Sequence, residues 1–169
     1  MRTIILMAIG ITTIFYSCAG SQSMSNYSDE EIIEAVKERE FVFVANRMIP
    51  NRGRSFYLNS YYDVVVSADT VVSFLPFFGR AYVAPIHPAD GGIRFTSTDF
   101  TYTEKEGRNG SRDIDIRPRD ENSVQSMFFS IFNNGTASLK VTSLNRTPIS
   151  FDGYIIPRKP AQQQTREKE

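Results

Sequence analysis

From Glu40 to Ile156 the sequence repeats one pattern, in which short alternations of apolar and polar residues are separated by turn residues. Alternation with a period of two places the apolar side chains on one face of a β-strand. Arg112 to Arg117 shows it most clearly, because Ile114 and Ile116 share one face and charged side chains occupy the other. Asn133-Asn134-Gly135 is the clearest turn, since Asn-Gly between two such stretches favours a tight hairpin. The pattern therefore restricts this part of the chain to a mainly antiparallel β fold.

The turn spacing predicts about eight strands. A bulge near Thr98-Asp99 would let Ile93, Phe95, Phe100 and Tyr102 all face the core, although the two pairs differ in parity. A sheet curled into a barrel and a two-sheet sandwich both satisfy the alternation, which does not separate them. The expected strands are 41–45, 55–58, 61–67, 70–75, the stretches around 93–95 and 100–102, 112–117, 124–132, 136–142 and 147–156.

One amphipathic helix is expected before the strands, from about Asp29 to Arg39. Ser28 is suited to cap its first turn, and Glu31 stands three residues later, as in a capping box. Acidic residues in the first turn also favour the positive end of the helix dipole. One face is apolar and is expected to pack on the core; it carries Ile32, Ile33 and Val36.

The first residues are typical of an export signal. Ile4 to Tyr16 is an apolar run of signal-peptide length, too short to span a bilayer as a helix. Small residues surround Cys18, and this arrangement resembles a bacterial lipobox, in which the cysteine thiol receives a diacylglycerol. The resemblance divides the chain into a signal peptide (1–17), a lipidated tether (18–27), a β domain with its leading helix (28–156) and a disordered tail (157–169). The alternative is an ordinary secretory signal with an incidental cysteine.

Composition excludes several classes of function. The 19 basic and 19 acidic residues balance, which argues against a nucleic-acid partner bound by phosphate neutralisation. A single Cys excludes a disulfide framework and a cysteine-based zinc site, and a single His excludes the usual multi-histidine metal sites. We therefore expect no metal and no cofactor.

Several motifs, taken in order, are similar to one protein family. They are Phe41-Val42-Phe43-Val44-Ala45-Asn46-Arg47, Leu58-Asn59-Ser60, Tyr62-Asp63, Phe77-Phe78-Gly79-Arg80-Ala81-Tyr82, Asp90-Gly91-Gly92-Ile93, Val141-Thr142-Ser143 and Pro148-Ile149-Ser150-Phe151-Asp152-Gly153-Tyr154. The chain resembles the Bacteroidota lipoprotein family called domain of unknown function 4251. The resemblance implies an exported cell-envelope lipoprotein, and it implies no activity, cofactor or catalytic residue.

An aromatic and arginine-rich group is the strongest candidate for a binding site. Such residues stack on rings, hold peptides and occur at interaction surfaces. Arg80 stands among apolar residues, so it requires a carboxylate such as Asp63 or Asp90, or else the anion of a ligand. The group comprises Tyr57, Tyr61, Tyr62, Phe77, Phe78, Tyr82, Arg52, Arg54 and Arg80, and within it the residues expected to bind a ligand are Arg80, Tyr82, Phe77, Phe78 and Tyr62.

Other residues suggest chemistry less directly. His87 is the only side chain with an ordinary pKa near neutrality, and a hydrolase would use it with nearby carboxylates. The carboxylates Asp113, Asp115, Asp120 and Glu121 lie among arginines, which instead indicates a solvated, charge-paired strand face. Asp90-Gly91-Gly92 is read as a turn with positive φ rather than an anion or calcium loop. Asp69-Thr70-Val71 resembles an O-glycosylation acceptor, with Thr70 as the modified residue.

These observations favour a non-catalytic binding module, anchored to the membrane by its lipid, for a small apolar or glycan ligand or a partner protein. The envelope hydrolase using His87 is one alternative. A structural or assembly lipoprotein that pairs by a sheet edge is another. The absence of an acidic run after Cys18 favours the periplasmic side of the outer membrane over the cell surface.

Overall fold

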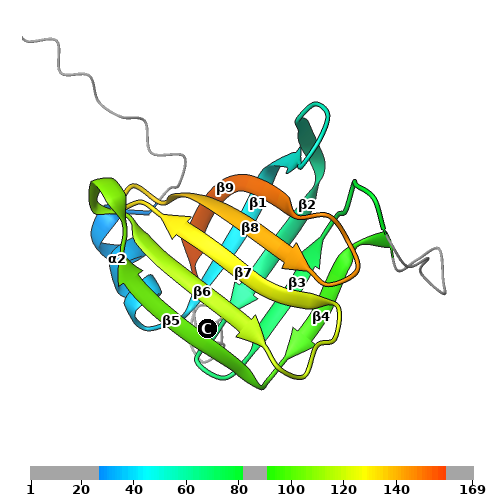
Figure 1. Ribbon diagram of the computed structural model, residues 1–169. Coiled ribbons are helices and arrows are strands. Elements are labelled where there is room, and N and C mark those ends of the chain that lie inside the picture. Colours follow the sequence, from blue (N-terminus) through cyan, green and yellow to red (C-terminus); the bar gives the residue numbers. More distant parts are fainter. Residues whose placement is uncertain (1–26, 82–90, 159–169) are drawn as a thin grey trace, which may run out of the picture.

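The computed structural model describes residues 27–81 and 91–158 (Figure 1). The described residues form one α-helix, one 3-10 turn and nine strands. Within these ranges, no helix is long and apolar enough to cross a membrane. The elements are α2 (Asp29–Lys37), β1 (Phe41–Pro50), β2 (Phe56–Val66), β3 (Val71–Leu75), β4 (Ile93–Ser97), β5 (Phe100–Glu106), η2 (Arg108–Gly110), β6 (Arg112–Pro118), β7 (Val124–Ile131), β8 (Thr136–Ser143) and β9 (Ile149–Pro157).

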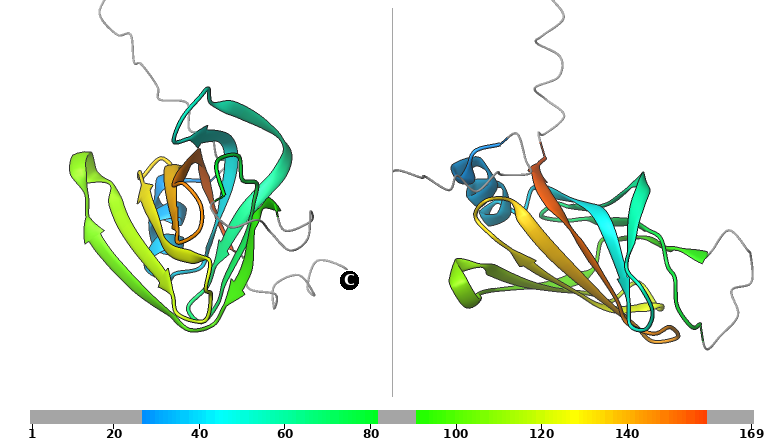
Figure 2. Two further views of the ribbon diagram at one scale, coloured as in Figure 1. Left: turned by 45° about the vertical axis from the view of Figure 1, so that its right-hand side comes forward. Right: turned by 90° about the horizontal axis from the view of Figure 1, so that it is seen from above.

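The strands form a single sheet in the order β4-β3-β2-β1-β9-β8-β7-β6-β5, and every neighbouring pair is antiparallel. The sheet curls into a nearly closed barrel, which decides between the two architectures that the alternation allows (Figures 1 and 2). The prediction of a mainly antiparallel β domain with one leading helix is confirmed. The two expected strands at 55–58 and 61–67 are one strand, β2, but its pairing with β1 is interrupted between Tyr57 and Tyr62, where the boundary was predicted.

A corner between β4 and β5 completes the curl. Only Thr98 and Asp99 separate the two strands, which lie at opposite edges of the sheet and diverge from the corner (Figure 2, left). The expected bulge is thus a break between two strands. Ile93, Phe95, Phe100 and Tyr102 nevertheless all contact the core, as predicted.

Asp120 holds this corner from the end of β6. Its carboxylate accepts the backbone N–H groups of Thr98 at 2.8 Å and Asp99 at 3.2 Å, and it also accepts the Ser97 hydroxyl. The Ser97 hydrogen bond, followed by the backbone donor of Thr98, lowers the pKa of Asp120 to about 2. The carboxylate therefore stays ionised, and keeps its three donors, throughout the physiological pH range.

Helix α2 covers one end of the barrel. The predicted capping box is present, with Glu31 N donating to the Ser28 hydroxyl and Ser28 N donating to the Glu31 carboxylate. Ile32 and Val36 are buried, whereas Ile33 is half-buried. The helix ends at Lys37, earlier than Arg39, because Arg39 adopts a left-handed φ of 59°. Its N–H then bonds Val36 O, and the following N–H bonds Ala35 O, which closes the helix end.

The described residues include one residue before the expected domain and two after it. Tyr27, placed by the sequence in the tether, packs against the core. Arg158 lies beyond the last strand, where its N–H donates to Glu40 O at 3.0 Å and its guanidinium pairs with the Glu40 carboxylate at 3.1 Å. The two ends of the described chain therefore meet at the end of the barrel that α2 covers.

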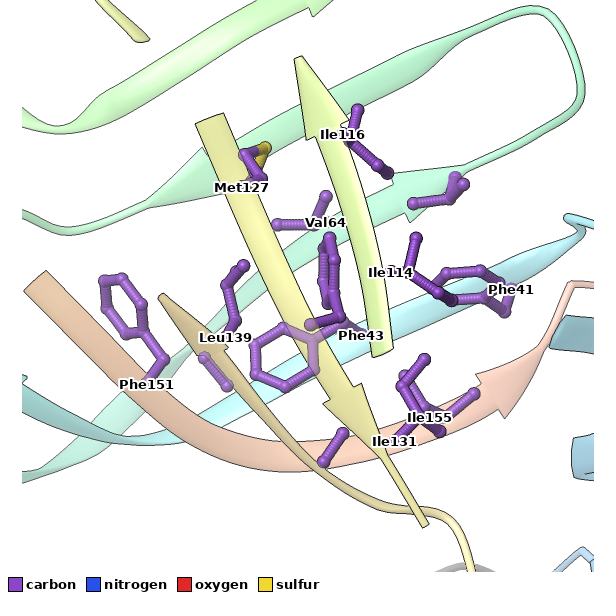
Figure 3. Close-up of a cluster of buried hydrophobic side chains, with 14 of the residues drawn as sticks. Phe41, Phe43, Val64, Ile114, Ile116, Met127, Ile131, Leu139, Phe151 and Ile155 are labelled. Carbon is purple, nitrogen blue, oxygen red and sulfur yellow. The ribbon is translucent and has the colours of Figure 1, made fainter. Parts of the chain in front are cut away.

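The core fills the barrel with side chains from the inner faces of all the strands around it. Figure 3 shows Phe43 from β1, Ile114 from β6 and Leu139 from β8 pointing into one cluster. The Phe129 ring of β7 makes edge-to-face contacts with Phe41 and Phe43, with ring centres 6.1 Å and 5.8 Å apart. Ala137, Leu139 and Val141 are buried on β8, as the hairpin pattern predicts.

Truncating Phe129 to alanine is expected to lower the free energy of unfolding by about 3–5 kcal/mol, because it removes a fully buried ring and leaves a cavity. Its neighbour Phe128 points outward and is 39% exposed, so Phe128→Ala is the matched control. Urea denaturation of both variants measures the difference. Equal losses of stability would contradict the assignment of the two faces of β7.

Candidate functional site

The barrel end opposite α2 carries a cavity of about 530 Å³, which we call the mouth cavity. Figure 2 (right) shows α2 at one end of the barrel and the β8–β9 connection at the other. The volume lies within the range of small-molecule sites. The residues that line the mouth cavity are Pro50, Asn51, Arg52, Phe77, Phe78, Gly79, Arg80 and Thr147.

Segment 77–81 reaches this position because Pro76 follows β3 and ends the strand pairing. The segment then docks on the β8–β9 connection, where Thr147 N donates to Arg80 O at 3.1 Å and Ala81 forms an isolated bridge with Arg146. Gly79 is required here, since a Cβ would lie 2.7 Å from Thr147 Oγ1. The close approach fixes one wall of the mouth cavity.

Arg146 joins three parts of the mouth. Its guanidinium lies 5.0 Å from the centre of the Phe77 ring, and its Nη1 donates to Gly92 O at 2.7 Å. Phe77 is consequently held half-buried against the core. Phe78 is 59% exposed and contacts the Phe56 ring edge-to-face, at 5.3 Å between ring centres. The mouth therefore presents aromatic surface to solvent beside the cavity.

The structure brings together three of the five residues expected to bind a ligand, Phe77, Phe78 and Arg80, and places Arg52 of the same aromatic and arginine-rich group beside them. Tyr62 lies elsewhere, stacked on Phe74 with ring centres 5.6 Å apart. Tyr82, the fifth, lies outside the described residues. Pro50, Asn51 and Thr147 were not predicted, because nothing in their local sequence shows that the ends of β1 and β8 meet segment 77–81.

Arg80 is exposed to solvent, and of the two carboxylates expected to neutralise it the structure describes only Asp63, which does not pair with it. Asp63 lies on β2, opposite Phe74 of β3, and burial raises its pKa. Asp90 lies outside the described residues, as does His87. Among the residues that the structure describes, neither Arg80 nor Arg52 has a carboxylate within ion-pair distance.

The acidic residues of β6 and its flank are structural. Asp113 accepts the Ser130 hydroxyl at 2.8 Å, Asp115 pairs with Arg117 at 2.7 Å, and Glu121 accepts Ser123 N at 2.8 Å. This confirms the charge-paired strand face. Asp113 and Asp115 also line one concavity on the outer face of β5 to β7, where Asp115 remains paired with Arg117. Within residues 27–81 and 91–158, no three His, Cys, Asp or Glu side chains are grouped to hold a metal ion.

Two smaller predictions concern turns. The positive φ predicted for Gly91 and Gly92 is wrong, since neither glycine has one; a Cβ on Gly92 would instead lie 2.7 Å from Leu75 O. Thr70 lies in the β2–β3 turn, half-buried, with its hydroxyl donating to the Asp69 carboxylate at 3.0 Å. Its glycosylation stays a prediction, as does lipidation of Cys18, which lies outside the described residues.

Comparison with known proteins identifies the family. The family "Domain of unknown function (DUF4251)" matches residues 23–155, most of the chain. The chain belongs to the DUF4251 family. No curated protein matches this DUF4251 chain. Among solved structures, it is similar to a DUF4251 family protein from Bacteroides eggerthii DSM 20697. The two sequences are 16% identical, and the two structures superpose with a TM-score of 0.57. The match covers 76% of this chain and 87% of the other chain. At this identity the likeness shows a shared fold.

One buried group of the DUF4251 barrel has no partner. The Tyr102 hydroxyl on β5 is buried and makes no hydrogen bond to the described residues, while Arg39 covers the ring at 4.4 Å from its centre. Burial, with a smaller contribution from Glu104, raises the pKa of Tyr102 above its ordinary value of 10.0. The folded state therefore holds the phenol proton more tightly than the unfolded chain does.

Tyr102→Phe is expected to raise the free energy of unfolding near neutral pH by about 1 kcal/mol, because it removes an unpaired buried hydroxyl. The parent chain should also lose stability as the pH rises past about 10, where unfolding releases the Tyr102 proton. The variant should lack that part of the loss. Thermal melts across the alkaline range, with Tyr57→Phe as the control at an exposed tyrosine, measure both effects. Identical pH profiles would show that Tyr102 is not buried as described.

Proposed function

We propose that this chain is a lipid-anchored, non-catalytic binding protein of the cell envelope, and that its mouth cavity takes a small ligand with an apolar part and a negatively charged group. The observation that carries the proposal is the meeting of Phe77, Phe78, Arg52 and Arg80 around one cavity of about 530 Å³. Aromatic rings provide apolar contact, and guanidinium groups bind carboxylate, sulfate or phosphate through paired hydrogen bonds.

The charge of the mouth supports an anion. Five arginines elsewhere in the described residues are paired with carboxylates: Arg47, Arg112, Arg117, Arg119 and Arg158. The two arginines of the mouth cavity are not, and among the residues that the structure describes no acidic side chain lines the cavity. A ligand anion would supply to Arg52 and Arg80 the charge that carboxylates supply to those five arginines.

The expected lipid anchor and the mouth cavity lie at opposite ends of the barrel. The described chain begins at Tyr27, beside α2, at the end of the barrel opposite the mouth cavity. If Cys18 carries the lipid, the tether joins the domain at the α2 end, and the mouth faces away from the membrane surface. A ligand from the aqueous side then has access to the mouth cavity. The sequence favours the periplasmic side of the outer membrane.

The alternatives draw less support. The hydrolase requires His87, which lies outside the described residues, and carboxylates that are instead engaged in the ion pairs and hydrogen bonds above. Assembly by a sheet edge has one favourable observation: β4 and β5 each pair with a strand on one side only. Such an edge accepts a strand from a partner protein.

Native mass spectrometry of the protein extracted from the membranes of its own cells tests the binding proposal. We expect a non-covalent adduct whose mass adds to that of the lipid. A glycan on Thr70 would be covalent, so Thr70→Ala would remove the mass of the glycan and leave the mass of the ligand. Arg80→Ala should reduce the fraction of protein carrying the adduct by about tenfold, since a hydrogen bond to a charged group contributes about 1.5–3 kcal/mol. Phe78→Ala should reduce it as well.

Arg117→Ala is the matched control, because Arg117 is an exposed arginine on the far strand β6. An adduct that survives both mouth substitutions would show that the ligand binds elsewhere. A bare mass with a co-purifying protein would overturn the small-ligand proposal in favour of the sheet-edge alternative.

Cys18→Ser tests the anchor separately. The variant should lose the diacylglycerol mass and move from the membrane fraction to the soluble fraction, because the thiol that carries the lipid is gone. Immunoblots of fractionated cells and intact mass measure the two effects. A membrane-bound variant of unchanged mass would contradict lipidation and leave an ordinary secretory signal as the interpretation.

A further inference from the structure

A second concavity lies on the outer face of the sheet, away from the mouth, with a volume of about 370 Å³. We call it the outer hollow. Its lining comes from four neighbouring strands and the end of a fifth, so its geometry is set by sheet pairing rather than by loops. The residues that line it are Asn46, Arg47, Tyr57, Phe132, Thr136, Ala137, Ser138, Asp152 and Gly153.

Strand register places four of these side chains in one straight row. Tyr57 of β2 lies opposite Arg47 of β1, Arg47 lies opposite Asp152 of β9, and Asp152 lies opposite Ser138 of β8. All four point outward, because the residues that alternate with them, such as Met48, Phe151 and Leu139, are buried. At the usual spacing between strands the row is about 14 Å long.

Two of the residues that line the hollow, Ala137 and Gly153, are small and buried, so they form its floor. Beside them, Asn46 is the extra residue of a bulge in β1 relative to β9, between Ala45 and Arg47. Gly153 lies opposite Ala45 on one side and Ala137 on the other, so three small residues adjoin. A side chain cannot replace Gly153, since a Cβ there would overlap the carbonyl oxygen of Val44. The sheet itself therefore keeps the depression open.

The chemistry of the outer hollow is polar but neutral. Arg47 donates to Asp152 Oδ2 from Nε at 2.9 Å and also from Nη2, and both bonds use the same carboxylate oxygen. The pair cancels its own charge while Asp152 Oδ1 and further guanidinium N–H groups are left to bind a ligand. Ser138 adds a hydroxyl at the end of the row. Asp152 would repel an anionic ligand, and Arg47 would repel a cationic one. A neutral ligand rich in hydroxyl groups therefore fits the hollow best.

Two exposed aromatic rings complete the site. Tyr57 is 79% exposed at one end of the row, and Phe132, after β7, is 41% exposed. Hydrating the apolar surface of such rings is unfavourable in free energy. A ligand with a partly apolar face removes that surface from water when it stacks on the ring. Sugar rings combine that face with a rim of hydroxyl groups.

We propose that the outer hollow binds a neutral oligosaccharide, whose rings lie along the row from Tyr57 to Ser138 and stack on Tyr57. Arg47 and Asp152 donate and accept hydrogen bonds at the centre of the row. The length of the row suits linked sugar rings rather than one. This site shares no residue with the mouth cavity and does not depend on its ligand.

Amide chemical-shift mapping of the full barrel with cellobiose, maltose and N,N′-diacetylchitobiose, at millimolar concentrations, tests the proposal. At least one of these neutral disaccharides should shift the amides of Arg47, Ser138 and Asp152 more than those of Arg80. Tyr57→Ala should weaken that binding by roughly three- to tenfold, as loss of a stacked ring does. Tyr57→Phe should retain it, because the ring stays.

Tyr61→Ala is the matched control, since Tyr61 is on the same strand and 60% exposed but lies outside the hollow. The highly exposed Tyr57 allows truncation without loss of the fold, which the dispersion of the amide spectrum checks directly. No shift with any of the three sugars would overturn the proposal. Shifts confined to the mouth would also overturn it while leaving the proposed function standing, and equal weakening in both alanine variants would exclude stacking on Tyr57.

Discussion

The pairing of β9 with β1 holds the structure together. The sheet consists of two sequential meanders, β1 to β4 and β5 to β9, and the ladder between β1 and β9 is where they join. Without it, neither meander could close its apolar face over the other, because Phe41 and Phe43 lie on one and Phe129 on the other. The corner that Asp120 caps is the second junction, and it is covalent as well as hydrogen-bonded. Closure of the barrel follows from these two junctions.

Closure gives the barrel two different ends. At one end α2, Tyr27 and the Arg158–Glu40 pair cover the core and bring the two ends of the described chain together. At the other, Pro76 releases segment 77–81 from the sheet, and Arg146 holds it across the β8–β9 connection. The second end has an exposed aromatic ring, Phe78, beside Arg52 and Arg80, for which the described residues supply no carboxylate. Aromatic rings beside arginines are enriched at interaction surfaces, and this asymmetry underlies the proposed function.

The same β1–β9 ladder also shapes the outer face. The ladder carries the bulge at Asn46, the close approach of Gly153 to β1 and the Arg47–Asp152 pair, and residues of all three line the outer hollow. The outer hollow is therefore a consequence of how the two meanders join. A binding site built from loops can accommodate insertions in those loops. The geometry of the outer hollow instead depends on the register between β1 and β9.

The sequence by itself determined the elements: period-two alternation, Asn-Gly and the Ser28–Glu31 capping box act over a few residues, and the hairpins and helix they predict are present. It also grouped Phe77, Phe78 and Arg80, which are adjacent in the chain and line one cavity in the structure. Only the tertiary structure decided between barrel and sandwich, separated Tyr62 from the other predicted residues and placed Arg52 and Thr147 beside Arg80. The row from Tyr57 to Ser138 includes Arg47 and Asp152, which pair although they lie 105 positions apart in the sequence. Alternation says which face a side chain is on, but pairing between distant strands decides its neighbours.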